Sequence, residues 1–240
     1  MQPRFLSNLI LLLGLNLLVK PFYLLVVEAE IQNRVGAPVF GTYFALINFS
    51  FILNIIPDLG ITNWNTKHIA QHSHLIKKHF AHIFTLRLCL SALFIMVCVV
   101  TGLLLNYNRE EMGILAVLAL AQVLSSLLLY LRSNLAGLHL FRRDSLLSVL
   151  DRLLLAAGMA TLLWTPLGGE RFDIRWLVWG QAISYAIGCL VALAMVLPHA
   201  GRLTLSWNPA FLAVVLKQSF PYAALIFLSA LAYRMDSVML

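Results

Sequence analysis

Long apolar stretches, separated by short polar segments, recur along the whole of the 240-residue chain. A helix rises about 1.5 Å per residue, so about 20 mostly apolar residues cross the hydrocarbon core of a bilayer. Six stretches reach that length and a seventh begins, at residues 5–27, 37–57, 81–105, 112–131, 146–164, 176–197 and 220 onward. The pattern therefore predicts an all-α fold, a polytopic transmembrane helical bundle.

The composition agrees with this pattern. Hydrophobic residues make up 61% of the chain and charged residues 11%, with a mean hydropathy of +0.87, whereas about 25% of residues in soluble domains are charged. These values exclude an ordinary soluble enzyme. The chain contains no P-loop, GxGxxG, HExxH, GxSxG or CxxC motif, so we expect no enzymatic activity, no cofactor and no metal site.

The net charge of +7 is best interpreted by the side of the membrane on which the charges fall, and not as a nucleic-acid surface. Eleven basic residues share a side with the N-terminus: Arg4, Lys67, Lys77, Lys78, Arg87, Arg132, Arg142, Arg143, Arg152, Arg202 and Lys217. The opposite side has four: Arg34, Arg109, Arg171 and Arg175. We therefore predict a cytoplasmic N-terminus. Lys20 and Arg234 belong to neither side, because the span assignment leaves them within the membrane.

The polar link at residues 202–217 is the best candidate for a domain boundary. We assign residues 1–203 to an N-terminal six-helix lobe and residues 204–240 to an inter-lobe link and the first helix of a second lobe. The chain stops inside that last helix with no polar anchor after it, so we expect it to be incomplete, and the residues alone do not tell whether it is a fragment of a 12- or 14-helix protein.

Charged and polar residues inside the spans are candidates for function, because a charge is costly at that depth. Asn16 and Lys20 are i,i+4 neighbours in the first span and can line one wall of a cavity. Pro21 can kink that helix. The alternative is that Lys20 extends toward the headgroup layer.

The second span ends in a polar turn. Asn54 and Asp58 lie one helical turn apart, and Pro57 and Gly60 flank the acid. This combination is typical of broken transporter helices, so we predict a gate or hinge. A simple turn or helix cap would explain the same residues.

The seventh stretch carries Tyr222, Ser229, Tyr233 and Asp236 on one helical face, whereas Arg234 points elsewhere. Arg234 and Asp236 therefore do not form a simple pair within the helix. Each needs a partner on another helix, a water or an ionic substrate, and we place them on a transport path.

Two further groups have simpler explanations. If residues 67–82 form one helix, His68, His72, His79 and His82 form a stripe, which favours a basic amphipathic helix on anionic lipid over a metal site. Asp151 and Arg152, one turn inside the fifth span, are expected to extend toward Arg142, Arg143 and the headgroups.

The second span and the seventh together resemble a known family. Gly36, Gly41, Tyr43, Asp58 and Gly60, with Arg234 and Asp236, match polysaccharide-biosynthesis exporters. These are flippases of lipid-linked O-antigen and related oligosaccharides, in the multidrug/oligosaccharidyl-lipid/polysaccharide superfamily. The resemblance implies two six-helix lobes around a central cavity that opens alternately to each side, in a bacterial cytoplasmic (inner) membrane.

The resemblance also implies a substrate, a polyprenyl-diphosphate-linked oligosaccharide for lipopolysaccharide or other surface polysaccharide. Cations at depth would meet its phosphates, so we assign substrate binding to Lys20, Arg234, Asn16 and Tyr233. Gating or coupling falls to Asp58, Asp236 and Asn54, with a gradient of H⁺ or Na⁺ as the driving force. Membrane lipids and polysaccharide-assembly proteins are the other expected partners.

Two alternatives stay open at this point. A multidrug antiporter of the same superfamily would export organic cations and would favour carboxylates over Lys20 in its cavity. A membrane-embedded lipid-modifying acyltransferase would need a catalytic histidine or paired carboxylates, and only the histidine stripe offers a candidate.

Overall fold

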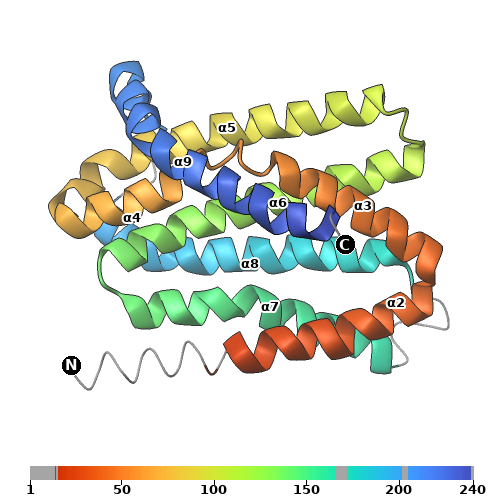
Figure 1. Cartoon of the computed structure of the whole chain (residues 1–240). Coiled ribbons are helices and arrows are strands. Elements are labelled where there is room, and N and C mark those ends of the chain that lie inside the picture. The colour runs from red at the N-terminus through yellow and green to blue at the C-terminus, as the bar shows by residue number, and fades with distance from the viewer. Residues whose placement is uncertain (1–13, 15, 166–171, 202–204, 239–240) are drawn as a thin grey trace.

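The computed structural model describes residues 14, 16–165, 172–201 and 205–238, with side chains up to residue 226 and at 228. Helices form nearly all of this part of the chain, and no strand occurs in it (Figure 1). The predicted all-α class is therefore confirmed.

The helices follow one another with short connections. Residues 16–22 are helical and lead into a π-helix, η1. The elements are η1 (Tyr23–Glu28), α2 (Ala29–Val35), α3 (Ala37–Leu53), α4 (Ile61–Gln71), η2 (Ser73–Leu75), α5 (Ile76–Leu104), α6 (Arg109–Gly137), α7 (Phe141–Trp164), α8 (Ile174–Ala200) and α9 (Pro209–Val238). The π-helix begins two residues after Pro21, and wide turns of this kind are frequent at functional sites.

Five helical segments are long and apolar enough to cross a membrane: residues Ser73–Leu104, Arg109–Gly137, Phe141–Trp164, Ile174–Ala200 and Pro209–Ile226. They correspond to the third to seventh predicted spans. The second span is the shorter apolar helix Ala37–Leu53, and much of the first lies outside the described residues. The structure is therefore that of a multi-pass membrane protein.

The last polar link is shorter than predicted. Helix α9 begins at Pro209, whereas the apolar pattern placed its start at Phe220. Proline is well tolerated in the first turn of a helix, and the Asn208 side chain accepts a hydrogen bond from the Phe211 amide at 3.1 Å. The polar residues that follow, including Lys217, therefore belong to the helix and not to the link.

Helix α6 lies at the centre of the bundle. More than half of the residues in its most apolar stretch are buried inside the protein. In α5, α7 and α8 one third of the corresponding residues are buried. Small and polar side chains on α6, among them Gln122, Ser126 and Asn134, are buried against neighbouring helices. Small residues of this kind allow close helix packing, and their polar groups bridge helices in the membrane.

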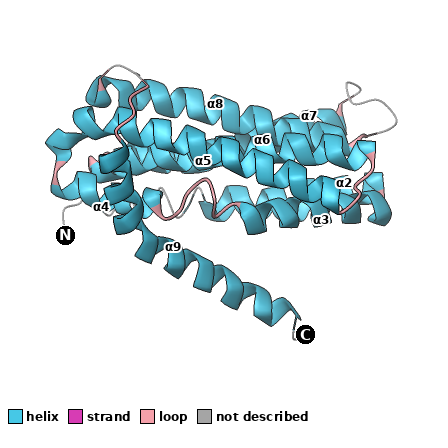
Figure 2. Ribbon diagram, turned by 90° about the horizontal axis from the view of Figure 1, so that it is seen from above, coloured by secondary structure: helices cyan, strands magenta, loops and turns pink. Residues whose placement is uncertain are grey.

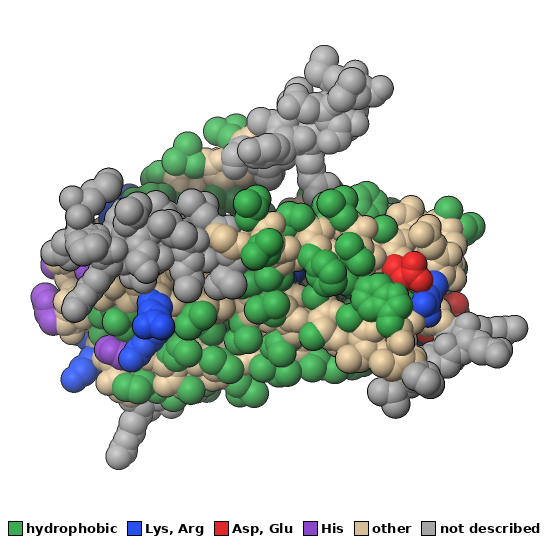
Figure 3. All heavy atoms as spheres, turned by 90° about the horizontal axis from the view of Figure 1, so that it is seen from below, with side chains coloured by type: hydrophobic (Ala, Val, Ile, Leu, Met, Phe, Trp, Pro, Cys, Tyr) green, Lys and Arg blue, Asp and Glu red, His purple; other side chains and the backbone are tan. Residues whose placement is uncertain are grey.

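Charges separate to the two ends of the bundle (Figure 3). One end carries lysine, arginine and histidine side chains, the other carries acidic side chains beside basic ones, and the surface between them is largely hydrophobic. Because α4 and α2 lie at opposite ends, Lys67 marks the basic end and Glu30 and Arg34 mark the acidic end (Figure 1). This separation is what a helical bundle across a bilayer requires.

The short helix α4 connects the bundle to α9. The Asn65 side chain donates to Ser133 Oγ on α6 at 2.8 Å, and Trp64 Nε1 donates to Gln218 Oε1 on α9 at 3.0 Å. Beyond this contact α9 leaves the other helices at an angle (Figure 2). Helix α4 thus holds α9 to the bundle, together with α5, whose His79 ring lies 4.5 Å from that of Phe211 on α9.

Gly60 makes this contact possible. Its φ of +75° is left-handed, and a Cβ built there would lie 2.5 Å from both Ser219 O and Ala223 N. These are backbone atoms of α9, which cannot move aside as a flexible side chain can. The glycine therefore sets how closely α9 approaches the start of α4.

We predict that Gly60→Ala loosens α9 and lowers the thermal stability of the purified protein in detergent. A left-handed alanine costs about 1–2 kcal/mol before any overlap with α9, so the midpoint should fall by about 4 °C or more. Gly41→Ala is the matched control, because a Cβ at Gly41 meets no atom within 4 Å and alanine favours the helix. Equal midpoints for the two variants would contradict the close approach at Gly60.

Candidate functional site: a buried arginine and a cationic cavity

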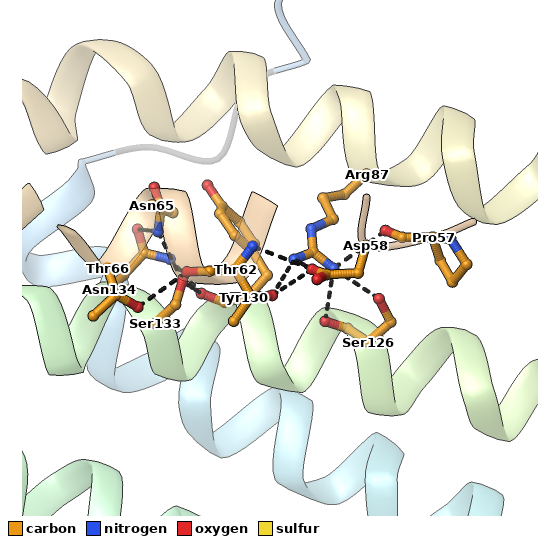
Figure 4. Close-up of polar contacts among 10 residues, drawn as sticks. All are labelled: Pro57, Asp58, Thr62, Asn65, Thr66, Arg87, Ser126, Tyr130, Ser133 and Asn134. Atoms are coloured by element: carbon orange, nitrogen blue, oxygen red, sulfur yellow. Dashed lines mark hydrogen bonds and ion pairs between the residues drawn. The ribbon is translucent and has the colours of Figure 1, made fainter. Parts of the chain in front are cut away.

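Arg87 of α5 is the centre of a buried polar network (Figure 4). Its side chain is fully enclosed, and its Nη2 pairs with the Asp58 carboxylate and donates to Thr62 Oγ1. Its Nη1 donates to the Pro57 carbonyl at 3.2 Å, and on α6 to the carbonyl (3.2 Å) and hydroxyl (2.7 Å) of Ser126. The guanidinium therefore joins α5, α6 and the turn between α3 and α4.

Asp58 lies in that turn, at residues 54–60, just before the start of α4 at Ile61. Its Oδ1 accepts hydrogen bonds from the Thr62 amide at 3.1 Å and from the Thr62 hydroxyl at 2.5 Å. Asp58 is thus both a cap for α4 and the counter-ion of Arg87. Its assignment to gating stays a prediction.

The position of Arg87 corrects the charge count along the sequence. That count placed Arg87 with the basic residues at the membrane surface, whereas the side chain is 0% exposed and paired. A signal was present, because Arg87 lies well inside the apolar stretch 81–105 and an ionic group at that depth needs a partner. Asp58, in the polar turn after the second span, was a candidate for that partner.

A cavity of about 610 Å³ lies next to this network. Residues of the first helical segment, η1, α3, α6, α7 and α8 line it. They are Lys20, Pro21, Tyr23, Leu24, Leu25, Glu28, Tyr43, Phe44, Ile47, Asn48, Phe51, Gln122, Arg152, Gln181 and Tyr185. The lining of the cavity therefore combines aromatic rings, amides and charged groups.

The charged groups of this cavity are two cations and one carboxylate. Lys20 is exposed, and the Arg152 guanidinium carbon lies 5.4 Å from the centre of the Tyr23 ring. Glu28 is the carboxylate, and its pKa is raised by burial, which outweighs the opposing effect of Arg152. The lining groups Lys20, Arg152 and Glu28 carry a formal charge of +1, and Asp151, the ion-pair partner of Arg152, lies outside the lining.

Neutral hydrogen-bonding groups line the same wall. Gln181 Nε2 donates to Tyr43 Oη at 2.6 Å, and both side chains are buried. Tyr43 is one of the residues on which the family resemblance depends, and the structure places it in the cavity. Hydroxyl and amide groups beside aromatic rings are well suited to sugars and to polar headgroups.

Arg152 also corrects a prediction. It was expected to extend with Asp151 toward Arg142, Arg143 and the headgroups, but its guanidinium lies over Tyr23 and lines the cavity. Asp151 stays near it, with 3.9 Å between Arg152 Nε and Asp151 Oδ2. The sequence placed Lys20 and Arg234 as the only cations within spans, and the structure adds Arg87 and Arg152.

Asn16 and Asn54 lie beside these two sites. Asn16 is partly buried, its Nδ2 is 3.5 Å from Ser148 Oγ on α7, and it is not among the residues that line the cavity. Asn54 Nδ2 donates to Gln122 Oε1 at 3.2 Å, and Gln122 lines the cavity. Asn54 thus connects the turn that holds Asp58 to the cavity wall.

The predicted residues of the seventh span cannot be placed around the site. The backbone of α9 reaches Val238, but the side chains of Tyr233, Arg234 and Asp236 lie outside the described residues. Their assignment to the transport path stays a prediction.

The histidine segment is not one helix, because α4 ends at Gln71 and α5 begins at Ile76. The fold still brings three rings together, with 5.4 Å from the His68 centroid to that of His72 and also to that of His79. His68 is packed on Trp64, and burial lowers its pKa. Within the described ranges, no group of three His, Cys, Asp or Glu side chains is placed to hold a metal ion.

Comparison with known proteins gives one match. A family model described as "Polysaccharide biosynthesis protein" matches residues 5–240. No curated protein and no solved structure matches the chain. The match covers both the cavity and the turn around Asp58.

We predict that Asp58→Asn destabilises the protein by about 3–5 kcal/mol, because it leaves Arg87 buried without a counter-ion. The double variant Asp58→Asn/Arg87→Met should recover part of this loss, and thermal unfolding in detergent measures both. The pair Arg132–Asp144 is the control, because its side chains are 22% and 19% exposed and Arg132→Met should cost less. Strictly additive single losses at positions 58 and 87 would contradict a coupled pair.

We also predict that water reaches Lys20. In a background with Cys89, Cys98 and Cys189 replaced by Ala, Lys20→Cys should react with a polar maleimide added to the protein in membranes. Leu190→Cys is the control, because Leu190 is 67% exposed but lies on the apolar outer surface of α8, where lipid excludes thiolate formation. Failure of Lys20→Cys to react, as expected for Leu190→Cys, would contradict aqueous access to Lys20 through the cavity.

Proposed function

The chain belongs to the polysaccharide biosynthesis protein family, and from this premise we propose that it moves a polyprenyl-diphosphate-linked oligosaccharide across the membrane. The observation that carries the proposal is the cavity in which Lys20 and Arg152 share one space with tyrosine, glutamine and asparagine side chains. In this view the described helices up to α8 form the N-terminal lobe of a flippase.

The cations answer the main physical difficulty of such transport. A diphosphate that enters a medium of low dielectric constant without partners loses hydration worth tens of kcal/mol, about the cost of an isolated ion. Arg152 can donate two parallel hydrogen bonds to a phosphate, and Lys20 adds a mobile point charge. The ring of Tyr23 beneath Arg152 limits the orientations of the guanidinium and prepares it for this contact.

The remaining cavity surface suits the other parts of the substrate. Tyr43, Gln181 and Asn48 present hydroxyl and amide groups that can bind sugar hydroxyls. Leu24, Leu25 and Phe51 also line the cavity and are exposed, so an apolar chain can lie against them in the lipid. The polar head would cross inside while the polyprenyl tail stays in the bilayer.

A second lobe completes the proposed path. Helix α9 leaves the bundle beyond α4, and we propose that it begins this lobe and supplies Tyr233, Arg234 and Asp236 (Figure 2). Rocking of the lobes would open the cavity to each side in turn, driven by an H⁺ or Na⁺ gradient. The turn of Asn54 and Asp58 touches the cavity through Gln122 and is our candidate for gating.

The orientation in the membrane is also a proposal. The basic end of the bundle, which includes Lys67, Lys77 and Arg142, would face the cytoplasm of a bacterial cell, and the N-terminus would lie on that side. The acidic end would then face outward. This arrangement brings the substrate to the cavity from the leaflet in which such lipids are assembled.

The multidrug antiporter is the second candidate function, and Glu28 is the observation in its favour. A carboxylate in the cavity could receive an organic cation, but here two cations accompany it. Glu28→Gln separates the two functions: it would abolish transport of an organic cation, whereas export of an anionic lipid should continue.

We predict that Lys20→Gln and Arg152→Gln each reduce glycan export by about tenfold or more in cells that depend on this protein, because each loses a charge-assisted hydrogen bond to phosphate. Arg152→Lys should recover only part, since the bidentate geometry is lost. Surface glycan, normalised to the amount of protein in the membrane, is the measurement. Arg142→Gln, exposed at the basic end, is the control, and normal export with both cavity cations neutralised would overturn the proposal.

A further inference from the structure

A second cavity, of about 500 Å³, lies between the first turns of α6 and α8 at the acidic end of the bundle. Arg109 and Arg175 contribute its charged groups, with Glu110 beside them, and Gly113, Val117 and Trp179 contribute its apolar wall. No residue of the cationic cavity described above lines it. It is therefore a separate site.

The two arginines are not neutralised in this cavity. Among the described residues Arg109 has no acidic partner. Arg175 Nη2 lies 3.3 Å from Glu110 Oε1, but these side chains are 54% and 79% exposed, so the pair is weak. Arg175 keeps further N–H groups for a ligand, and the groups that line the cavity carry one positive charge in excess, while the neighbouring Glu111 and Asp173 carboxylates accept hydrogen bonds from the Asn108 and Arg175 amides.

An apolar surface continues from the arginines toward the middle of the bundle. On α8 the exposed residues Trp179, Ile183 and Ile187 follow at intervals of four. On α6 the exposed residues Ala116 and Leu120 do the same. Residues four apart share one helical face, so both faces are turned outward beside the cavity.

We propose that this cavity binds an anionic phospholipid. The phosphate lies between Arg109 and Arg175, and an acyl chain follows the apolar surface of α8 past Trp179. Trp179 is half exposed one turn beyond Arg175, which is where tryptophans mark the boundary between headgroups and hydrocarbon.

A phospholipid fits better than free phosphate for two reasons. The arginines are open to solvent, so ionic attraction alone would be screened by salt. The apolar surface next to the arginines stabilises a bound molecule only if that molecule has an acyl chain to bury against it. The site thus selects both a negative headgroup and a chain.

Native mass spectrometry of the purified full chain tests this directly, with phosphatidylglycerol and phosphatidylcholine as probes. We expect preferential retention of phosphatidylglycerol. A basic side chain near a charged surface contributes about 1 kcal/mol, or about fivefold, so Arg109→Gln or Arg175→Gln should weaken retention about fivefold and the double variant about thirtyfold. Arg34→Gln is the control, because Arg34 lies at the same end but pairs with Glu30 at 2.8 Å.

Circular dichroism shows whether each variant is folded, so that a loss of bound lipid can be assigned to the cavity and not to unfolding. Equal retention of the two lipids would overturn the proposal, as would retention that the double variant leaves unchanged. Displacement of phosphatidylglycerol by inorganic phosphate at equal concentration would do the same, since the tail would then contribute nothing. Stronger retention of a polyprenyl phosphate through Arg109 and Arg175 would assign the cavity to that lipid instead.

Discussion

The burial of Arg87 constrains the whole of the region where α3, α4, α5 and α6 meet. A guanidinium with no exposed surface is stable inside a bundle only when its charge and its N–H groups have partners. Asp58, Thr62, Ser126 and the Pro57 carbonyl are the partners of its two terminal nitrogens, whereas Nε has no hydrogen-bond partner among the described residues. Because those partners come from three separate elements, the ion pair also determines where α3 ends and where α4 begins.

This constraint extends to the cavity and to α9. Asn54, in the same turn as Asp58, donates to Gln122 in the cavity wall. Gly60, at the other end of the turn, is in backbone contact with α9. A shift in the turn would therefore act on the cavity and on α9 together, as coupling between a binding site and a lobe movement requires.

The sequence predicts the helical class and most spans, because about 20 apolar residues in a row have few alternatives in a bilayer. It also identifies Lys20, which lines the cavity, and Asp58, which lies at the buried network. It misplaces Arg87 and Arg152, since a count of charges by side cannot say whether a helix turns a cation inward or outward. That choice depends on tertiary partners such as Tyr23, which are distant in the sequence.

The cations inside this protein differ in whether a counter-ion compensates their charge. This difference separates cations that stabilise the fold from candidates for substrate binding. Arg87 is enclosed and has a counter-ion, so its charge is already compensated and out of reach of a ligand. Arg152 and Lys20 line an open cavity whose lining includes one carboxylate, Glu28, so positive charge is in excess on the lining even though Asp151 lies 3.9 Å from Arg152. In a medium where an uncompensated charge is costly, such an excess is retained only where something negative binds. The positive charge that carboxylates do not compensate is therefore the best guide to where an anionic substrate would pass.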